Sequence, residues 1–233
     1  MNLPIDIISV NCLNPLESLK ALDYSTEILK FNNSYLFTHE KINSTKHKVI
    51  NINKFNSITD YSDFILGIGN YVDSEYVLIV QDDGYIINPK KWTNEFLAYD
   101  YIGAPWPGQY TWRKRWKNET YQKAYINSKK NRVGNGGFSL RSRKFLNFSS
   151  AFNSTNGIPE DVFLCLINYE SAKKNGIKFP SAEIAYNFSC EVPLGGFNLS
   201  KKIKNHHLDI NQHFGWHGKR VKNFEHLLKL KEI

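Results

Sequence analysis

Apolar residues follow two different spacings along the N-terminal third of the chain. The run from Ile5 to Val10 is apolar apart from Asp6 and Ser9, as expected of a strand buried on both faces. Similar short runs predict further strands, and the segments between them show apolar residues at helical spacing. Strands are predicted at 5–10, 34–38, 49–52 and 76–80, with helices after Asn14 and over 61–72.

The two helices carry distinct sequence signals. Asn14 can cap the first helix, Pro15 suits its first position, and Glu17 can complete a capping box. The second helix is the clearest in the chain, because its apolar residues recur at i, i+3, i+4 and i+7. This alternation of strands and helices predicts an α/β fold: a single domain with a mostly parallel, doubly wound sheet flanked by helices.

Later segments are less regular. Residues 107–132 are aromatic and basic without periodicity, which favours a long loop or lid that meets an anionic ligand; a solvated insertion is the alternative. A helix is predicted from Pro159 to near Gly176. A basic amphipathic helix is predicted over 219–233, and such a tail can dock on its own domain or on a membrane surface.

Composition narrows the class of protein only in part. With 233 residues, of which 41% are hydrophobic and 22% charged, one folded domain is expected. A net charge of +8 favours anionic partners such as nucleic acid, acidic phospholipid or phosphorylated sugars, although a generally Lys-rich composition explains it equally well.

Cysteine usage and hydropathy bear on the compartment. Cys12, Cys165 and Cys190 are too few and too widely spaced for a disulfide framework or a zinc site, and Cys12 and Cys165 lie in apolar stretches as buried residues would. Neither a signal peptide nor an apolar run of about 20 residues is recognised, so we expect a cytoplasmic protein.

Acidic residues at the end of a predicted strand are the first candidate site. Gln81-Asp82-Asp83-Gly84 follows the apolar run 76–80, and open α/β sheets bind ligands beyond the carboxyl ends of their strands. Carboxylate oxygens are ligands that Mg²⁺ and Mn²⁺ accept, so we favour a metal site over an exposed Asp-Asp-Gly turn.

Three weaker signals lie further along the chain. The Gly-rich segment 134–139 permits close backbone approach, and Glu160 and Asp161 follow Pro159 at a predicted helix start. Either His213 or His217 can complete a metal site. Each of these signals also has an ordinary structural explanation.

Taken in order, these segments resemble a family of bacterial glycosyltransferase-like proteins of unknown function, often met in surface-polysaccharide gene contexts. The resemblance rests on Gln81–Gly84, Tyr99–Trp106, Gly134–Arg141 and Glu160–Val162, and it spans roughly Tyr76–His217. The first strand and its helix also resemble the start of a GT-A nucleotide-sugar domain. More distantly, the Glu-Asp-Val element is similar to that of inverting β-1,3-galactosyltransferases.

The resemblance implies a metal-dependent inverting glycosyltransferase that uses Mn²⁺ or Mg²⁺. Asp161 matches the catalytic base of the Glu-Asp-Val element. Asp83 and His217 are the implied metal ligands, with His213 as the alternative histidine. Gln81 stands where the related enzymes have the first Asp of an Asp-x-Asp motif, so the resemblance leaves open how ribose and metal are shared between these positions and implies Asp83 as the direct metal ligand.

Substrate contacts and chain organisation follow from the same resemblance. Residues 1–106 are the expected nucleotide-sugar-binding half, 107–132 a flexible lid, 133–218 the acceptor and catalytic half, and 219–233 a basic C-terminal helix. The expected substrate-binding residues are Asn11, Thr38, Gln81, Asp82, Gly136, Gly137 and Glu160.

The implied partners are a nucleotide-sugar donor, with UDP as the first choice, and a glycan or lipid-linked glycan acceptor. A peripheral contact with an anionic membrane at its inner face accords with the basic tail. Two other classes stay open: a nucleic-acid-binding protein, suggested by the aromatic and basic residues 112–116, and a metal-dependent nucleotidyltransferase or phosphodiesterase, which also uses paired carboxylates.

Overall fold

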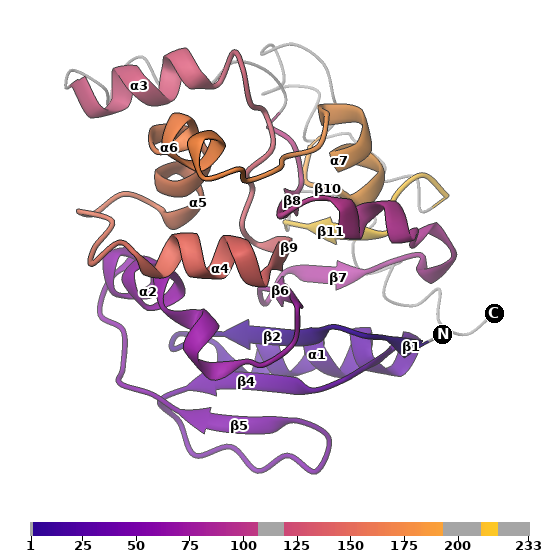
Figure 1. The fold of residues 1–233 in the computed structure, drawn as a ribbon. Coiled ribbons are helices and arrows are strands. Elements are labelled where there is room, and N and C mark those ends of the chain that lie inside the picture. Colours follow the sequence, from indigo (N-terminus) through magenta and orange to yellow (C-terminus); the bar gives the residue numbers. More distant parts are fainter. Residues whose placement is uncertain (1, 107–118, 193–210, 219–233) are drawn as a thin grey trace.

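The main sheet of the protein has six strands, drawn in Figure 1. The structure is a computed structural model that describes residues 2–106, 119–192 and 211–218. Three of the five strand pairs are parallel and the last two are antiparallel. The strands follow one another as β5 (Lys48–Asn51), β4 (Ser34–Thr38), β2 (Asp6–Val10), β6 (Tyr76–Val80), β9 (Phe138–Ser142) and β8 (Tyr101–Gly103).

Side chains alternate between the two faces of this sheet, and helices cover both faces. One face packs against Leu22 of α1 (Pro15–Ile28). The other packs against Ile65 of α2 (Ile58–Leu66) and against the 3₁₀ turn η1 (Ile68–Tyr71). The first face includes Ile7, Leu36 and Leu78, and the second includes Ile8, Phe37 and Ile79.

The predicted α/β fold, a mostly parallel and doubly wound sheet flanked by helices, is therefore confirmed. The strands predicted at 34–38 and 76–80 have these bounds in the structure, and the other two differ by one residue at one or both ends. Chain order matters for function: α1 leads from β2 to β4 on one side, whereas α2 leads to β6 on the other. The carboxyl ends of β2 and β6 thus form a topological switch point, where open α/β sheets bind ligands.

A second, smaller sheet begins shortly after β6, and its strand β7 (Gly84–Ile86) lies beside α1 (Figure 1). It consists of β10 (Ser189–Cys190), β11 (Gly215–His217) and β7. β11 is antiparallel to β7, which places His217 opposite Gly84. Gly84 is buried, so the Asp-Asp-Gly segment links two sheets and is not an exposed turn. A separate pair is formed by β1 (Asn2–Leu3) and β3 (Lys30–Phe31).

The remaining helices correct two predictions. The segment 107–132 is not a loop throughout, because α3 (Glu119–Asn127) is helical; residues 107–118 and the predicted tail helix 219–233 lie outside the described residues. The helix predicted from Pro159 begins there but is interrupted. It comprises α5 (Glu160–Val162), the π-helical η4 (Phe163–Ile167) and α6 (Tyr169–Lys174). The structure also describes the helical segments η2 (Pro89–Lys91), η3 (Asn94–Ala98), α4 (Arg143–Ser150) and α7 (Ala182–Phe188).

The start of α1 also differs from the prediction. Pro15 is its first residue, but the Asn14 side chain makes no capping hydrogen bond. The Asn11 side chain instead stabilises the turn that leads into α1, because its Oδ1 accepts from the backbone N–H groups of Leu13 and Asn14, each at 2.8 Å. The capping box of the structure lies at α2, between Ser57 and Asp60.

Two further expectations concern burial and membranes. Cys12 and Cys165 are buried, as predicted, and all three cysteines are free. Within the described part of the chain, no helix combines the length and the apolar character needed to cross a bilayer.

Substitutions at Ser57 and Asn14 test which of the two side chains caps a helix. Ser57→Ala removes the hydroxyl that accepts from the Asp60 N–H at 3.1 Å, and we expect it to destabilise the protein by about 1 kcal/mol. Asn14→Ala removes no capping bond and should be close to neutral. Urea denaturation measures both free energies of unfolding, and a larger loss for Asn14→Ala would contradict the assignment.

Candidate active site

Three polar side chains meet where β6 ends. A backbone bond of 2.8 Å from the Gln81 N–H to the Gly137 carbonyl fixes the chain, and the Gly84 N–H bonds back to the Gln81 carbonyl at 2.9 Å. The Nε2 atom of His217 lies 3.2 Å from Asp83 Oδ1 and 3.2 Å from Gln81 Oε1. The turn after β6 and the ladder between β7 and β11 therefore bring together residues far apart in the chain.

The electrostatics of His217 follow from its neighbour. Burial alone lowers the pKa of His217, but the hydrogen bond and negative charge of Asp83 outweigh burial, so the pKa is raised above its ordinary value. His213 lies elsewhere: its Nδ1 is 2.6 Å from the Tyr186 carbonyl oxygen and its ring packs edge-on against Tyr186. Of the two predicted histidines, His217 is the one beside Asp83.

The residues around His217 fit a divalent cation in their chemistry. Asp83 offers a carboxylate oxygen and His217 an imidazole nitrogen, a combination suited to Mn²⁺. Neighbouring ligands of an octahedral cation with bonds of about 2.1 Å are about 3.0 Å apart, close to the 3.2 Å observed. In the part of the chain that the structure describes, no cluster of three or more His, Cys, Asp or Glu is suited to a metal.

Two consecutive glycines connect this group to Asp161. The Gly136 N–H donates to Asp161 Oδ2 at 3.2 Å. A Cβ on Gly137 would lie only 1.9 Å from His217 Nε2, so glycine is required there for the imidazole to fit. Because consecutive Cα atoms are about 3.8 Å apart, Asp161 and His217 lie close together on either side of this loop.

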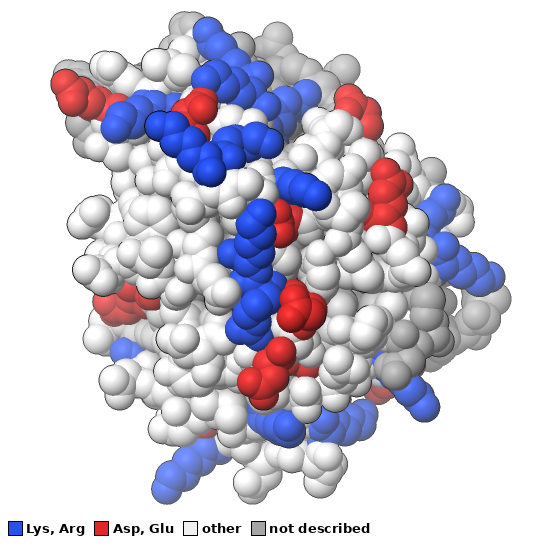
Figure 2. Space-filling view, viewed as in Figure 1, with Lys and Arg blue, Asp and Glu red and all other residues white. Residues whose placement is uncertain are grey.

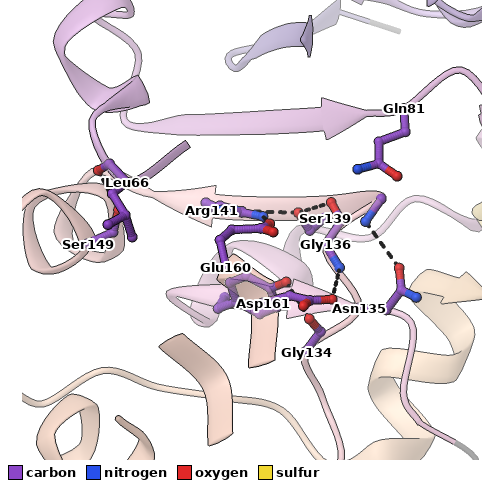
Figure 3. Close-up of polar contacts among 12 residues, drawn as sticks. Leu66, Gln81, Gly134, Asn135, Gly136, Ser139, Arg141, Ser149, Glu160 and Asp161 are labelled. Atoms are coloured by element: carbon purple, nitrogen blue, oxygen red, sulfur yellow. Dashed lines mark hydrogen bonds and ion pairs between the residues drawn. The ribbon is translucent and has the colours of Figure 1, made fainter. Parts of the chain in front are cut away.

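Side chains brace the glycine loop from both ends, as Figure 3 shows. Asn135 Oδ1 accepts from the Gly137 N–H at 3.1 Å, and its Nδ2 donates to Glu191 at 2.7 Å. Ser139 Oγ donates to the Gly136 carbonyl at 3.0 Å. The close approach predicted for these glycines is thus an approach to side chains of the same protein.

Asp161 has an unusual protonation equilibrium. Desolvation and the charge of Glu160 raise its pKa to about 7, although the backbone N–H groups of Val162 and Gly136 favour the ionised form. Since α5 has only three residues, the effect of burial on this carboxyl group outweighs that of a helix dipole.

A buried ion pair holds Glu160. Its Oε1 lies 2.8 Å from Nη2 of Arg141, whose side chain is only 1% exposed. Arg141 also donates to Ser139 Oγ at 3.1 Å and lies over the Tyr101 ring, 5.2 Å from its centroid. The Glu160 carboxylate is therefore engaged within the fold, next to Asp161 (Figure 3).

A pocket of about 410 Å³ opens at the switch point between β2 and β6. Tyr61 forms part of its wall and accepts a hydrogen bond of 2.9 Å from Gln81 Nε2. Asp82 is the charged residue of the lining, which includes no Lys or Arg among the described residues. The pocket is lined by Val10, Asn11, Cys12, Leu13, Phe55, Asn56, Ser57, Ile58, Tyr61, Gln81 and Asp82.

Some of the predicted substrate contacts line this pocket, and Thr38 does not. Asn11 lines it, but its amide is already bonded to Ser18 and to the start of α1. Thr38 is fully buried outside the lining, and its hydroxyl accepts from the Glu40 N–H at 3.3 Å. Gln81 and Asp82, which are also predicted substrate contacts, line the pocket.

Sequence reasoning missed two residues of the site. Tyr61 was assigned to the apolar face of a helix, where its hydroxyl gave no separate signal. Glu191 has no local motif, and only its bond to Asn135 places it near the glycine loop.

Within the described part of the chain, no Lys or Arg lines the pocket. On the face shown in Figure 2, Lys and Arg side chains gather over α3 and α6, with acidic side chains among them. Lys130 forms an ion pair there with Glu170. The aromatic and basic residues 112–116, which suggested nucleic-acid binding, lie outside the described residues.

Comparison with known proteins gives a family and distant similarities of fold. Residues 44–207 match a family described as "Protein of unknown function (DUF5672)". No curated protein matches the sequence.

Among solved structures, the chain is similar to the galactosyltransferase LgtC in complex with donor and acceptor sugar analogues, with a TM-score of 0.46, 13% identity and coverage of 97% of this chain and 94% of that one. The chain is also similar to a glycosyltransferase involved in the glycosylation of the major capsid of PBCV-1. The TM-score is 0.47 and the identity 12%, with coverage of 96% of this chain and 98% of that one. For the bifunctional IspDF from Campylobacter jejuni, the TM-score is 0.43 and the identity 10%. The match covers 70% of this chain and 47% of that one, so the chain spans less than half of that protein. At such low scores and identities, these similarities do not inform the chemistry of this chain.

The buried ion pair allows a stability test. Arg141→Met leaves the Glu160 carboxylate buried without its partner, and we expect a loss of about 3–5 kcal/mol in the free energy of unfolding. The double variant Arg141→Met/Glu160→Gln removes both charges and should recover a large part of that loss. Lys20→Met, which breaks the exposed pair with Glu17, is the control and should change little. Equal losses for the single and double variants in urea would show that the pair does not act as a unit.

Proposed function

The chain belongs to the DUF5672 family of proteins of unknown function, and from its site we propose that it is a metal-dependent glycosyltransferase that moves a sugar from a nucleotide-sugar donor to an acceptor hydroxyl. One observation carries the proposal. A pocket at the switch point of the sheet adjoins the Asp83–His217 pair through Gln81, and Asp161 of α5 accepts a hydrogen bond from Gly136, the residue before Gly137 in the glycine loop.

The pocket suits the nucleoside part of a donor. Leu13 and Ile58 at its edge are 83% and 59% exposed, and with Phe55 they offer apolar surface to a flat base. Asp82 can accept hydrogen bonds from ribose hydroxyls. The described lining has no Lys or Arg to meet a diphosphate, and a cation held by the neighbouring Asp83–His217 pair would balance the negative charge of that diphosphate.

Asp83 and His217 are the proposed ligands of that cation. A bound Mn²⁺ or Mg²⁺ supplies Lewis-acid stabilisation of the departing diphosphate. The buried position of His217, packed against Gly137, restricts its imidazole to the orientation in which Nε2 faces Asp83.

Asp161 is the proposed base. Its carboxylate takes the proton of the acceptor hydroxyl while that oxygen forms a bond to the anomeric carbon. The bond from the anomeric carbon to the diphosphate oxygen breaks at the same time, and its electron pair leaves with the nucleoside diphosphate. A base opposite the leaving group gives inversion of configuration. The backbone N–H groups of Gly136 and Val162 hold the carboxylate in place through its two oxygens.

Other parts of the proposal rest on the sequence resemblance. These are UDP as the nucleotide, a glycan or lipid-linked glycan as the acceptor, surface-polysaccharide or glycoconjugate synthesis as the context, and a cytoplasmic location with contact at the membrane. The substrate roles of Thr38, Gly136, Gly137 and Glu160 stay predictions as well.

Donor binding tests the metal pair. Asp83→Asn keeps the shape of the side chain but removes its charge, so we expect UDP to lose at least about tenfold in Mn²⁺-dependent affinity. Isothermal titration with and without Mn²⁺ measures this. Asp73→Asn, at an exposed position outside helices and strands, is the matched control. Unchanged Mn²⁺-dependent affinity in Asp83→Asn would remove Asp83 from the site.

The pH dependence of transfer tests Asp161. Because only the ionised carboxylate accepts a proton, kcat/KM should fall about tenfold per pH unit below a pKa of about 7 and level off above it. Asp161→Asn should lose nearly all transfer while it keeps donor binding. The product, examined by NMR, should have the anomeric configuration opposite to that of the donor. Retention of configuration, or normal turnover by Asp161→Asn, would rule out this base.

A further inference from the structure

We propose that the amide oxygen of Gln81 is a third protein ligand of the cation, and that Tyr61 is a positioning residue that holds the amide in the required orientation. The inference rests on the proposed function, because it concerns the same cation. It assigns a specific role to the residue at which this chain departs from the Asp-x-Asp pattern.

The orientation of the Gln81 amide follows from its two neighbours. Asp83 Oδ1 can only accept a hydrogen bond when ionised, so the His217 Nε2 atom 3.2 Å away carries the proton that they share. The Gln81 atom 3.2 Å from the same Nε2 must then be the carbonyl oxygen and not the NH₂ group. The NH₂ group consequently faces Tyr61, whose hydroxyl oxygen accepts from it at 2.9 Å.

This arrangement directs three donor atoms toward one place. The oxygens of Asp83 and Gln81 both face His217 Nε2, each at a distance typical of neighbouring ligands around a six-coordinate cation. A cation at this place would be held by the same three atoms that share a proton in the metal-free protein. Amide oxygens are ordinary ligands for such cations, so the set is one carboxylate, one amide and one imidazole.

The charge of this set has a functional consequence. With a carboxylate at position 83 only, the three side chains carry one negative charge, whereas a second carboxylate at position 81 would give two. Ligand charge is a main determinant of affinity for hard cations. The protein alone should therefore hold Mn²⁺ weakly, and Mn²⁺ should bind firmly only together with a diphosphate, which supplies further oxygens and charge.

Tyr61 is placed to link the pocket with this set. It lies on α2 shortly after the Ser57 cap, and its ring meets Phe55 edge-on with centroids 6.2 Å apart. Burial, together with the charge of Glu160, raises its pKa above the ordinary value, so the hydroxyl stays neutral and available for hydrogen bonding. The same residue forms part of the pocket wall and bonds to Gln81.

Substitutions at position 81 test the ligand. Binding of Mn²⁺ is followed by electron paramagnetic resonance, which measures the free ion, first with Mn²⁺ alone and then with UDP. Gln81→Glu should bind Mn²⁺ alone at least about tenfold more tightly than the wild type, because it adds a carboxylate to the set. Gln81→Ala should weaken binding of Mn²⁺ with UDP by about tenfold. The gain in Gln81→Glu keeps the test informative even if Gln81→Ala folds poorly.

A double-mutant cycle tests Tyr61. Tyr61→Phe keeps the ring but removes the acceptor for the Gln81 NH₂ group, so Mn²⁺ binding should weaken by several-fold, about threefold to tenfold. In the Gln81→Ala background the same change should have no further effect, because Tyr61 acts through Gln81. Additive losses would mean that Tyr61 affects the site independently and would overturn its positioning role.

The outcomes separate this inference from the proposed function. If Asp83→Asn abolishes Mn²⁺ binding while Gln81→Glu and Gln81→Ala bind as the wild type does, Gln81 is not a ligand and the proposed function still stands. If Gln81→Glu gains Mn²⁺ affinity but no nucleotide or nucleotide sugar binds to any variant, the ligand assignment stands and the proposed function is wrong.

Discussion

The site depends on the absence of side chains at two consecutive positions of the glycine loop. A Cβ on Gly137 would overlap the His217 imidazole, and a Cβ on Gly136 would lie 2.5 Å from Glu160 Oε1. The same loop bonds to the chain at Gln81 through the Gly137 carbonyl. Close packing of backbone against side chains therefore lets one loop join the end of β6, the second sheet and the start of α5.

Burial of charge is the second physical theme of this region. Arg141 and Glu160 neutralise one another in an interior where neither could remain alone, and their pair lies against Gly136 and Asp161. Two backbone N–H groups donate to the Asp161 carboxylate, but they do not offset its desolvation and the charge of Glu160. A carboxylate with a pKa near neutrality is the result, a property useful to a general base.

The charge distribution around the pocket suggests that the pocket binds the nucleoside and that the neighbouring group of Gln81, Asp83 and His217 binds the cation. The pocket offers apolar surface, amide groups and one carboxylate, but no basic side chain among its described lining residues. Affinity for an anionic donor would then depend on the group of Gln81, Asp83 and His217 next to it. The positive charge over α3 and α6 in Figure 2 is a separate feature of the surface.

The sequence by itself determined the elements and the class of fold, because the spacing of apolar residues is a local property. The strands at 34–38 and 76–80 and the helix after Pro15 could be located in this way. It also marked Asp83, Asp161 and the glycine loop as candidates. Their relation to one another was decided only by tertiary structure, since Gln81 and His217 are 136 positions apart and meet through the β7–β11 ladder. The proximity of His217 to Asp83, the pairing of Arg141 with Glu160 and the raised pKa of Asp161 likewise depend on burial and long-range packing, which no local pattern encodes.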